Sequence, residues 1–485
     1  MLKRIFSLLL TVTLLAWTTP AVAQSSGPTD TPTPAPTQQP APSGPTYVIQ
    51  SGDTLSSIAS DFGITLSDLM AANNITNANN ISAGAQITIP GLDGITGNLD
   101  RQSVAYGDTL DSIGRRDQVP LDLLRRLNRI TSPAELYAGR GLIVPQKDNF
   151  TPLSTRLSLQ PGETLLEAAV LAQSDPWTLA DLNQLKASWA ALPGEVLYTG
   201  AAASSDGPGA SGLPSAILSA SVAPLPITQG GTAEITVQTM PGATLSGMLV
   251  DRALQFFSLG NDKFVALQGA YALLDPGPYP LEIDATLPDG SKQSFSQMVI
   301  IKDGNYPTDP VLTVGSDTID PAENDAEIKQ LETITAPVTP TKYWQGGFTN
   351  PTLPQFADCH PSFFGDRRNY VGSGTTKTYH SFHAGLDFCE QVGDPLFAAA
   401  DGVVVFTGML TAHGNTTILD DGWGIYTLYA HQSEIDVQVG QTLKAGDKIG
   451  LAGATGRVTG PHLHFEVWVN GVEVNPVDWL KNVYP

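Results

Sequence analysis

A motif that recurs at a fixed spacing limits the folds open to the first 200 residues of this 485-residue chain. The motif Gly52-Asp53-Thr54-Leu55 returns as Gly107-Asp108-Thr109-Leu110 and again as Gly162-Glu163-Thr164-Leu165, a period of about 55 residues. Each copy is followed by a short apolar stretch near its end, at 87–90, 142–145 and 196–198. The chain therefore begins with three small repeated units, and its length leaves room for further domains.

The first repeat predicts a strand–helix–helix–strand unit. Residues 47–50 form a short strand, and Asp53 or Thr54 can cap a helix whose apolar face includes Leu55, Ile58 and Phe62. A second helical face follows at 66–70, Asn73-Asn74 ends it, and 87–89 closes the unit as a strand. The sequence YVIQSGDTLSSIASDFGITLSDLMAANNI, with ISAGAQITIP after it, resembles a LysM domain, the module that binds N-acetylglucosamine chains of peptidoglycan and chitin.

The resemblance implies LysM-like repeats at 46–90, 102–145 and 155–200. The second keeps the pattern but carries Arg115, Arg116, Arg125 and Arg126, and the third is looser, so both are degenerate copies. An alternative is that these two are spacers that no longer bind sugar.

Other segments of the chain have distinct compositions. Lys3 and Arg4, an apolar run and a small-x-small site at 21–23 predict a secretory signal peptide over 1–23, with a membrane anchor as the alternative. No later stretch is long and apolar enough to span a bilayer, so no stable membrane insertion is expected after cleavage. Linkers are expected at 24–45 and 201–213. Alternating strands and a hairpin signal at Pro288-Asp289-Gly290 predict an all-β Ig-like sandwich over 214–303.

A connection with a short helix is expected over 304–342, followed by a last domain over 343–485. The helix begins at the cap Asp320 with Pro321 behind it and should end near Glu332. The formal charge of −22 argues against nucleic acid as a partner, because phosphate binding needs clustered Lys and Arg.

Two cysteines, Cys359 and Cys389, are the only ones in the sequence. In an exported protein a disulfide between them is expected, closing a loop of about thirty residues worth roughly 3–4 kcal/mol. Buried reduced thiols are the alternative. Zinc ligation is disfavoured, because the pair lacks the Cys-x-x-Cys spacing.

All seven histidines lie in the last third of the chain, at positions 360, 380, 383, 413, 431, 462 and 464. His462 and His464 are two apart in an apolar, β-branched stretch, so in a strand they point to the same side. His383 and Asp387 form a second pair of candidate ligands. A catalytic zinc site keeps three protein ligands and one open position, and His383, Asp387 and one histidine of the other pair supply such a set.

The last domain resembles the lysostaphin-type zinc endopeptidases of peptidoglycan over about 348–478. The resemblance rests on SFHAGLDF (381–388), DPLFAAADGVVVFTG (394–408) and the long stretch from YTLYAHQS to GPHLHFEVWVNG (426–471). It implies a mostly antiparallel β metallopeptidase domain, with His383, Asp387 and His464 as Zn²⁺ ligands and His431 and His462 as catalytic residues.

One departure from the family is visible in Asp420-Asp421-Gly422, where the family has a histidine before the glycine. His360, His380 and His413 match no motif position and are interpreted as surface or structural residues, with His380 also placed to support a ligand from behind.

These features predict a secreted, cell-wall-associated protein. Its expected function is zinc-dependent hydrolysis of peptide bonds in peptidoglycan, with LysM-type repeats holding the glycan. An alternative is a non-enzymatic wall-binding protein that regulates other hydrolases, although such relatives have lost a ligand and this chain has lost none. A sugar-cleaving enzyme ranks last, because no pair of carboxylates stands in a recognisable motif.

Overall fold

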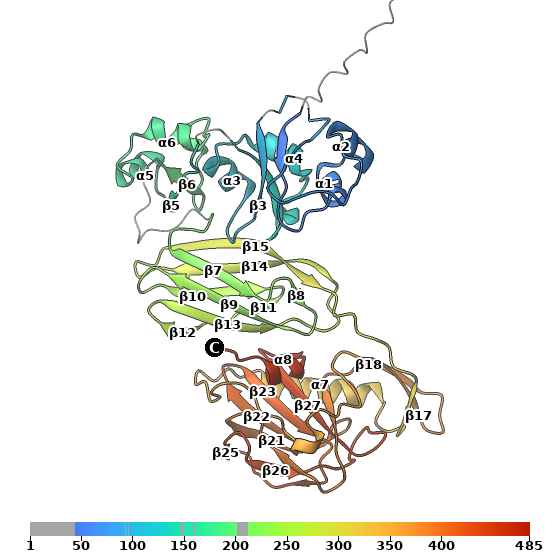
Figure 1. The fold of residues 1–485 in the computed structure, drawn as a ribbon. Coiled ribbons are helices and arrows are strands. Elements are labelled where there is room, and N and C mark those ends of the chain that lie inside the picture. Colours follow the sequence, from blue (N-terminus) through green and yellow to red (C-terminus); the bar gives the residue numbers. More distant parts are fainter. Residues whose placement is uncertain (1–43, 93, 96, 147–149, 160–161, 201–211) are drawn as a thin grey trace, which may run out of the picture. The chain divides into compact units, whose positions relative to one another are not determined.

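The computed structural model describes residues 44–92, 94–95, 97–146, 150–159, 162–200 and 212–485 (Figure 1). The expected signal peptide and nearly all of both expected linkers lie outside the described residues. Within the described part of the chain, no helix is both long enough and apolar enough to span a membrane.

The repeated motif acts as a helix start in all three units. Thr54, Thr109 and Thr164 are N-caps, and the side chain of each accepts a hydrogen bond from the backbone N–H three residues on. The first unit contains β1 (Thr46–Val48), α1 (Leu55–Phe62), α2 (Leu66–Ala72) and β2 (Gln86–Thr88). This is the predicted strand–helix–helix–strand order.

The second and third units repeat this order. The second contains β3 (Asn98–Ser103), α3 (Leu110–Arg116), α4 (Leu121–Asn128), η1 (Pro133–Glu135) and β4 (Gly141–Gln146). The third contains β5 (Thr155–Ser158), α5 (Leu165–Leu171), α6 (Pro176–Leu182), η2 (Ser188–Ala190) and β6 (Val196–Thr199). The strands of the first two units form one sheet in the order β2-β1-β3-β4, and β5 pairs with β6 alone.

A second residue type repeats with the same period and ties each helix pair to its closing strand. Asn73, Asn128 and Asn183 each donate to a carbonyl in the second helix and to a carbonyl of the closing strand. Each also accepts a backbone N–H from that strand. The third unit therefore keeps the internal bonding of the first, even though its sequence is looser.

Two mainly antiparallel sheets with a shared apolar core follow. One has the strand order β11-β10-β14-β15-β8 and the other β12-β13-β9-β7. Their strands are β7 (Ile217–Ala223), β8 (Ile227–Thr228), β9 (Thr232–Thr239), β10 (Thr244–Leu249), β11 (Arg252–Ala253), β12 (Phe257–Gly260), β13 (Lys263–Gly269), β14 (Gly277–Thr286) and β15 (Lys292–Lys302). Pairing of β14 with β15 confirms the hairpin at 288–290. The Ig-like topology stays a prediction.

The last part of the chain is built on a seven-stranded antiparallel sheet. Its order is β19-β27-β23-β22-β21-β25, with β28 also paired to β27. These strands are β19 (Leu386–Cys389), β21 (Gly402–Leu410), β22 (Gly414–Gly422), β23 (Ile425–Ala430), β25 (Thr442–Leu443), β27 (His462–Val469) and β28 (Val472–Val474). One apolar core includes Phe388, Leu463 and Phe465, and a second includes Ile418, Leu428 and Trp468.

Smaller elements surround this sheet. One three-stranded sheet joins β20 (Pro395–Phe397), β26 (Lys448–Leu451) and β24 (Glu434–Ile435), and another joins β16 (Leu312–Val314), β17 (Arg367–Gly372) and β18 (Thr378–Phe382). Short helices η3 (Pro354–Phe356) and α8 (Pro476–Lys481) complete the fold.

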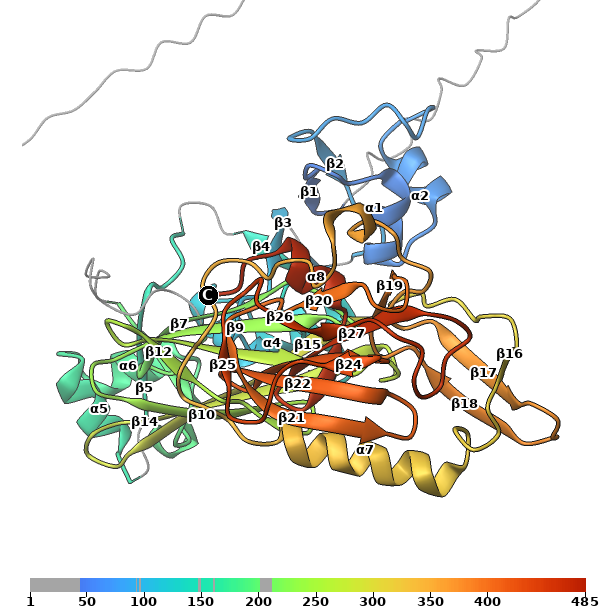
Figure 2. The same cartoon turned by 90° about the horizontal axis from the view of Figure 1, so that it is seen from below.

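Helix α7 (Pro321–Thr335) differs from the expected short helix in a connection. It runs one turn past Glu332, and its Leu331 belongs to the same core as Leu410, Tyr426 and Leu428 of the large sheet. Figure 2 shows the helix running beside β21 and β22. Segment 304–342 therefore contributes a packed element to the last part of the fold rather than a connection alone.

Candidate active site

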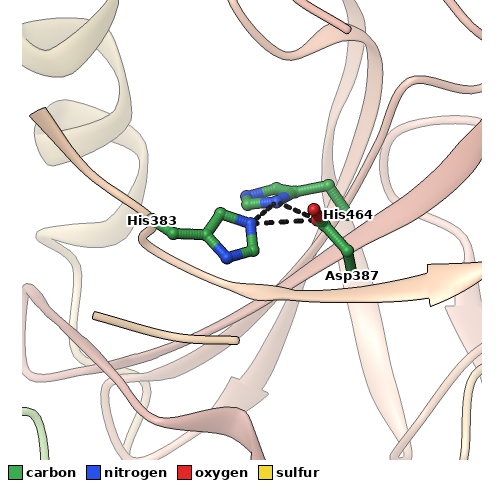
Figure 3. Close-up of side chains that lie close together, drawn as sticks. All are labelled: His383, Asp387 and His464. Carbon is green, nitrogen blue, oxygen red and sulfur yellow. Dashed lines mark hydrogen bonds and ion pairs between the residues drawn. The ribbon is translucent and has the colours of Figure 1, made fainter. Parts of the chain in front are cut away.

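Strand register brings the predicted ligands together. In the antiparallel pair β19–β27, Asp387 lies directly opposite His464, so the two side chains share a face of the sheet. His383 lies three residues before β19 begins, and β23, on the other side of β27, places Ala430 opposite His464 and so brings His431 to the same end. Figure 3 shows the side chains of His383, Asp387 and His464 converging on one point.

Three ligand atoms form a small triangle at that point. His383 Nε2 lies 2.9 Å from Asp387 Oδ1 and 2.9 Å from His464 Nδ1, and His464 Nδ1 lies 3.0 Å from Asp387 Oδ1. In a tetrahedral zinc site with bonds near 2.0–2.1 Å, neighbouring ligand atoms are about 3.3 Å apart. The triangle is therefore close to the size that such an ion requires, and the three side chains could hold a metal.

The other nitrogen of each imidazole fixes which atom faces the triangle. His383 Nδ1 donates to the carbonyl of Phe363 at 2.8 Å, which leaves Nε2 with its lone pair. His464 Nε2 donates to Glu466 Oε1 at 2.8 Å, which leaves Nδ1 with its lone pair. In their neutral forms the two imidazoles therefore bring two nitrogen lone pairs to a carboxylate oxygen, with no donor among the three atoms. Such an arrangement calls for a cation, and support of each ligand from behind is usual around metal sites.

The electrostatics of the three groups agree with this interpretation. Burial lowers the pKa of His383, so its imidazole is neutral near pH 7. Burial works to raise the pKa of Asp387, but the neighbouring His383 and His464 hold it well below its usual range. Burial likewise opposes protonation of His464, yet its hydrogen bonds to Asp387 and Glu466 raise its pKa. Positive charge at this point is favoured, whether it comes from a proton or from a metal.

Asp387 has a cationic neighbour on its outer side. The guanidinium of Arg368, in β17, lies 3.7 Å from Asp387 Oδ2 and 3.1 Å from Asp309 Oδ2. It also donates to the hydroxyl of Ser362. Arg368 therefore neutralises the carboxylate oxygen that does not enter the triangle and fixes its orientation.

His431 and His462 lie next to the triangle without belonging to it. Their rings are 4.7 Å apart, and His462 Nε2 is 3.6 Å from Asp387 Oδ1. His431 Nδ1 donates to the carbonyl of Thr455 at 2.7 Å, and His462 Nδ1 donates to the carbonyl of Gly460 at 2.9 Å. Each histidine therefore keeps Nε2 as the atom that can accept a proton.

His431 has two further features of a functional residue. Burial, together with the nearby His462, lowers its pKa well below the usual value, so it is neutral near pH 7 and can act as a base. Its backbone lies in the left-handed region at φ 59°, a conformation that non-glycine residues adopt mainly where the surroundings impose it.

The remaining histidines take different positions. His380 is exposed, contacts Asn369 and lies in the wall of the groove that leads to the site. His360 contacts the backbone carbonyl of Asp387. His413, interpreted as a surface or structural residue, has an imidazole that bridges Glu327 and Glu466, the residue that holds His464.

Four supporting groups were missed by sequence reasoning: the Phe363 carbonyl, Arg368, Glu466 and Glu327. Only Glu466 carried a usable signal, since it follows His464 by two residues in a strand and so shares its face. A groove of about 770 Å³ leads to the site, with Tyr370, Tyr379 and Arg457 in its wall.

The structure joins Cys359 and Cys389 in a disulfide. Cys389 is the last residue of β19, two positions after Asp387, and its N–H donates to the carbonyl of Cys359. In the same way the N–H of Asp387 donates to the carbonyl of Ser362. The disulfide therefore holds loop 359–366 against the strand that carries a ligand.

Comparison with known proteins identifies the parts of the chain. Residues 381–476 match the model of peptidase family M23, and residues 47–90 and 103–145 match the model of the LysM domain. The chain thus carries two LysM domains and a domain of the M23 metallopeptidase family. The third unit, 155–200, lies outside these matches, and its interpretation as a LysM-like repeat stays a prediction.

Among similar proteins is the DD-carboxypeptidase/endopeptidase Mpg of Neisseria meningitidis serogroup B, 44% identical over 95 residues, which are 20% of this chain and 22% of that protein. The peptidoglycan DD-endopeptidase ShyA of Vibrio cholerae is 46% identical over 93 residues, 19% of this chain and 22% of the relative. The chain therefore spans about a fifth of the length of these curated relatives. A solved zinc-containing peptidase from Vibrio cholerae aligns with 91% of this chain and 99% of its own, at 16% identity and a TM-score of 0.26.

Proposed function

We propose that this chain is a secreted, zinc-dependent endopeptidase that hydrolyses peptide bonds of bacterial peptidoglycan and is held at the cell wall by its LysM units. The observation that carries the proposal is the convergence of three acceptor atoms, from His383, Asp387 and His464, with His431 and His462 beside them. The ligand chemistry of two imidazoles and one carboxylate suits Zn²⁺.

The side chains of the site have different roles in the proposed hydrolysis. Zinc, when bound, supplies the Lewis acid that polarises a carbonyl and acidifies water. The Phe363 carbonyl and Glu466 keep both ligand imidazoles in the tautomer that faces the ion. In His431 and His462, Nδ1 donates to a backbone carbonyl, so Nε2 carries the lone pair. Either histidine can therefore accept the proton of the attacking water and return it to the leaving amine.

The peptide bond proposed as substrate follows from the relatives. Mpg and ShyA are named for action on DD bonds, and the matched residues of this chain are those of the peptidase domain. We therefore expect cleavage at a cross-link between stem peptides, with the LysM units binding the glycan strands.

The test is digestion of purified sacculi by the full chain, with mass spectrometry of the released fragments. We expect cross-linked muropeptides to be converted to monomers, and a chelator to stop this conversion. The His464→Ala variant should lose cleavage by at least about 10³-fold while still sedimenting with sacculi. A wall-binding regulator predicts a different result, in which neither protein releases fragments and the variant keeps full function.

A further inference from the structure

Helix α7 lies before the residues matched to the peptidase family, yet it is fixed to the sheet that carries the site. Asp320 caps it and Pro321 occupies its first position, while Leu331 buries its apolar side in the core formed with β21, β22 and β23. Asn324 accepts a hydrogen bond from Arg457, whose guanidinium lies 4.6 Å from the ring of Tyr370 in the groove wall. The helix thus has both apolar and polar attachments near the site.

Glu327 of this helix points into the turn between β21 and β22. Its carboxylate accepts the backbone N–H of Ala412 at 2.7 Å, the backbone N–H of His413 at 3.3 Å, and the imidazole Nδ1–H of His413. The residue is only 6% exposed. A buried carboxylate with three donors from one turn fixes the conformation of that turn.

The turn contacts the site at two points, through Glu466 to His464 and through the backbone to His431. His413 Nε2 donates to Glu466 Oε1 at 3.0 Å, the same oxygen that accepts from His464 Nε2, and Glu466 Oε2 accepts from Trp468 at 2.7 Å. The backbone carbonyl of His413 accepts the N–H of His431 at 2.8 Å. Glu327 is therefore connected to a ligand by side chains and to a catalytic histidine by the backbone.

Charge explains why the turn holds a histidine between two acids. Glu327 and Glu466 are both buried, and an unpaired buried carboxylate is costly. Nδ1 of His413 faces Glu327 and Nε2 of His413 faces Glu466, so each buried acid has an imidazole nitrogen as its partner. An imidazolium at His413 donates from both nitrogens, which satisfies both acids at once and leaves Glu466 free to accept from His464 as well.

We propose that Glu327 is a positioning residue for the metal site, acting through His413 and Glu466 on His464 and through the His413 backbone on His431. The inference rests on the proposed function for its zinc ion. It makes helix α7 a required part of the peptidase, although the helix lies outside the segment matched to the family.

The test compares the full chain with its Glu327→Ala variant in two assays: zinc affinity by competition with a chromogenic chelator, and kcat and KM on a soluble cross-linked muropeptide. Loss of a residue directly behind a ligand weakens metal binding on the order of 10–100-fold, and because Glu327 acts through His413 and Glu466 we expect a loss near the lower end of that range, about 10-fold. We expect kcat to fall with KM nearly unchanged, because the carboxylate of Glu327 is bonded to the turn at 412–413.

Two further variants separate positioning from general damage to the helix. Glu327→Gln should restore zinc affinity in part, because the amide oxygen can still accept from Ala412 and the NH2 can donate to His413 Nδ1, while the acceptor for the backbone N–H of His413 is lost. Glu323→Ala removes an exposed acid from the first turn of the same helix and should leave zinc affinity unchanged.

A double-mutant cycle tests the path itself. If Glu327 acts through His413, adding Glu327→Ala to His413→Ala should weaken zinc binding by much less than Glu327→Ala does alone. Full additivity of the two losses, or unchanged zinc affinity in Glu327→Ala, would overturn the inference. A wild-type chain that binds zinc but cuts no peptidoglycan contradicts the proposed function alone, since the affinity comparison still decides the role of Glu327.

Discussion

The site depends on which atom of each side chain is already engaged elsewhere. His383 gives one nitrogen to a backbone carbonyl and His464 gives one to a carboxylate, so the remaining lone pairs meet at Asp387. A substitution that only changed these outer partners would leave the ligand residues in the sequence but alter the tautomers they present. The site therefore requires both the ligand residues themselves and the imidazole tautomers that their outer partners impose.

Asp421 gives a prediction that is independent of the metal. It stands where the resemblance to the lysostaphin-type endopeptidases implies a histidine. It is fully buried in β22, and its Oδ2 has no hydrogen-bond partner among the described residues. Burial raises its pKa well above the usual value. As pH rises above the ordinary carboxyl pKa near 4, the unfolded state releases this proton while the folded state retains it, so the free energy of unfolding falls.

The Asp421→Asn variant should remove this dependence. We expect the variant and the wild type to have similar melting temperatures at pH 4, and the variant to become progressively more stable toward pH 8. The difference can grow by up to about 1.4 kcal/mol per pH unit until the folded-state pKa is reached. Melting curves at five pH values measure it; a constant gap between the two proteins would show that Asp421 does not titrate in this way.

At the scale of elements, a helix or strand could be predicted from the sequence when its signal lay within a few neighbouring residues. The strand from His462 to Val469 and the strand–helix–helix–strand order of the first repeat follow from spacing within a few residues of sequence, and the structure has both as predicted. The docking of helix α7 could not be foreseen, because Glu327 and His413 are 86 residues apart and neither is in a motif. The Phe363 contribution is a backbone carbonyl, which any residue there could supply.

The three candidate metal ligands could be predicted from the sequence, whereas the groups that support them could not. His383, Asp387 and His464 come from motifs whose spacing reflects a strand pair, so their convergence follows from register. Arg368 reaches Asp387 from β17, a strand in a different sheet, and only the three-dimensional fold brings it there.

The disulfide gives a prediction about an element, the loop before β19. Cys359 and Cys389 are separated by 30 residues, so the cross-link should stabilise the folded chain by about 3–4 kcal/mol. Because the loop also carries the Phe363 carbonyl that orients His383, losing the cross-link should weaken zinc binding as well as lower the melting temperature.

This can be measured by adding reductant to the wild type and to a Cys359→Ser/Cys389→Ser variant. The wild type should lose stability on reduction, toward the lower melting temperature of the variant, and the variant should not respond to reductant. If both proteins melted alike before and after reduction, the loop would be held by its backbone bonds alone.

At the scale of the whole molecule, the chain combines two segments matched to the LysM domain with one segment matched to peptidase family M23. The matched LysM segments and the matched M23 segment occupy separate regions of sequence. The net charge of −22 is summed over the whole sequence. The charge at the site itself is set by the groups that surround it. The proposed function therefore depends first on whether His383, Asp387 and His464 hold a metal ion.

The most direct test is zinc K-edge absorption spectroscopy on the full chain, with metal content measured in parallel. We predict one zinc per chain, bound by two imidazole nitrogens and oxygen ligands at about 2.0–2.1 Å, with no sulfur. His464→Ala should lose the ion, whereas His431→Ala and His462→Ala should retain it. A sulfur-bound ion, or a His464→Ala variant that keeps zinc in the wild-type environment, would contradict the account.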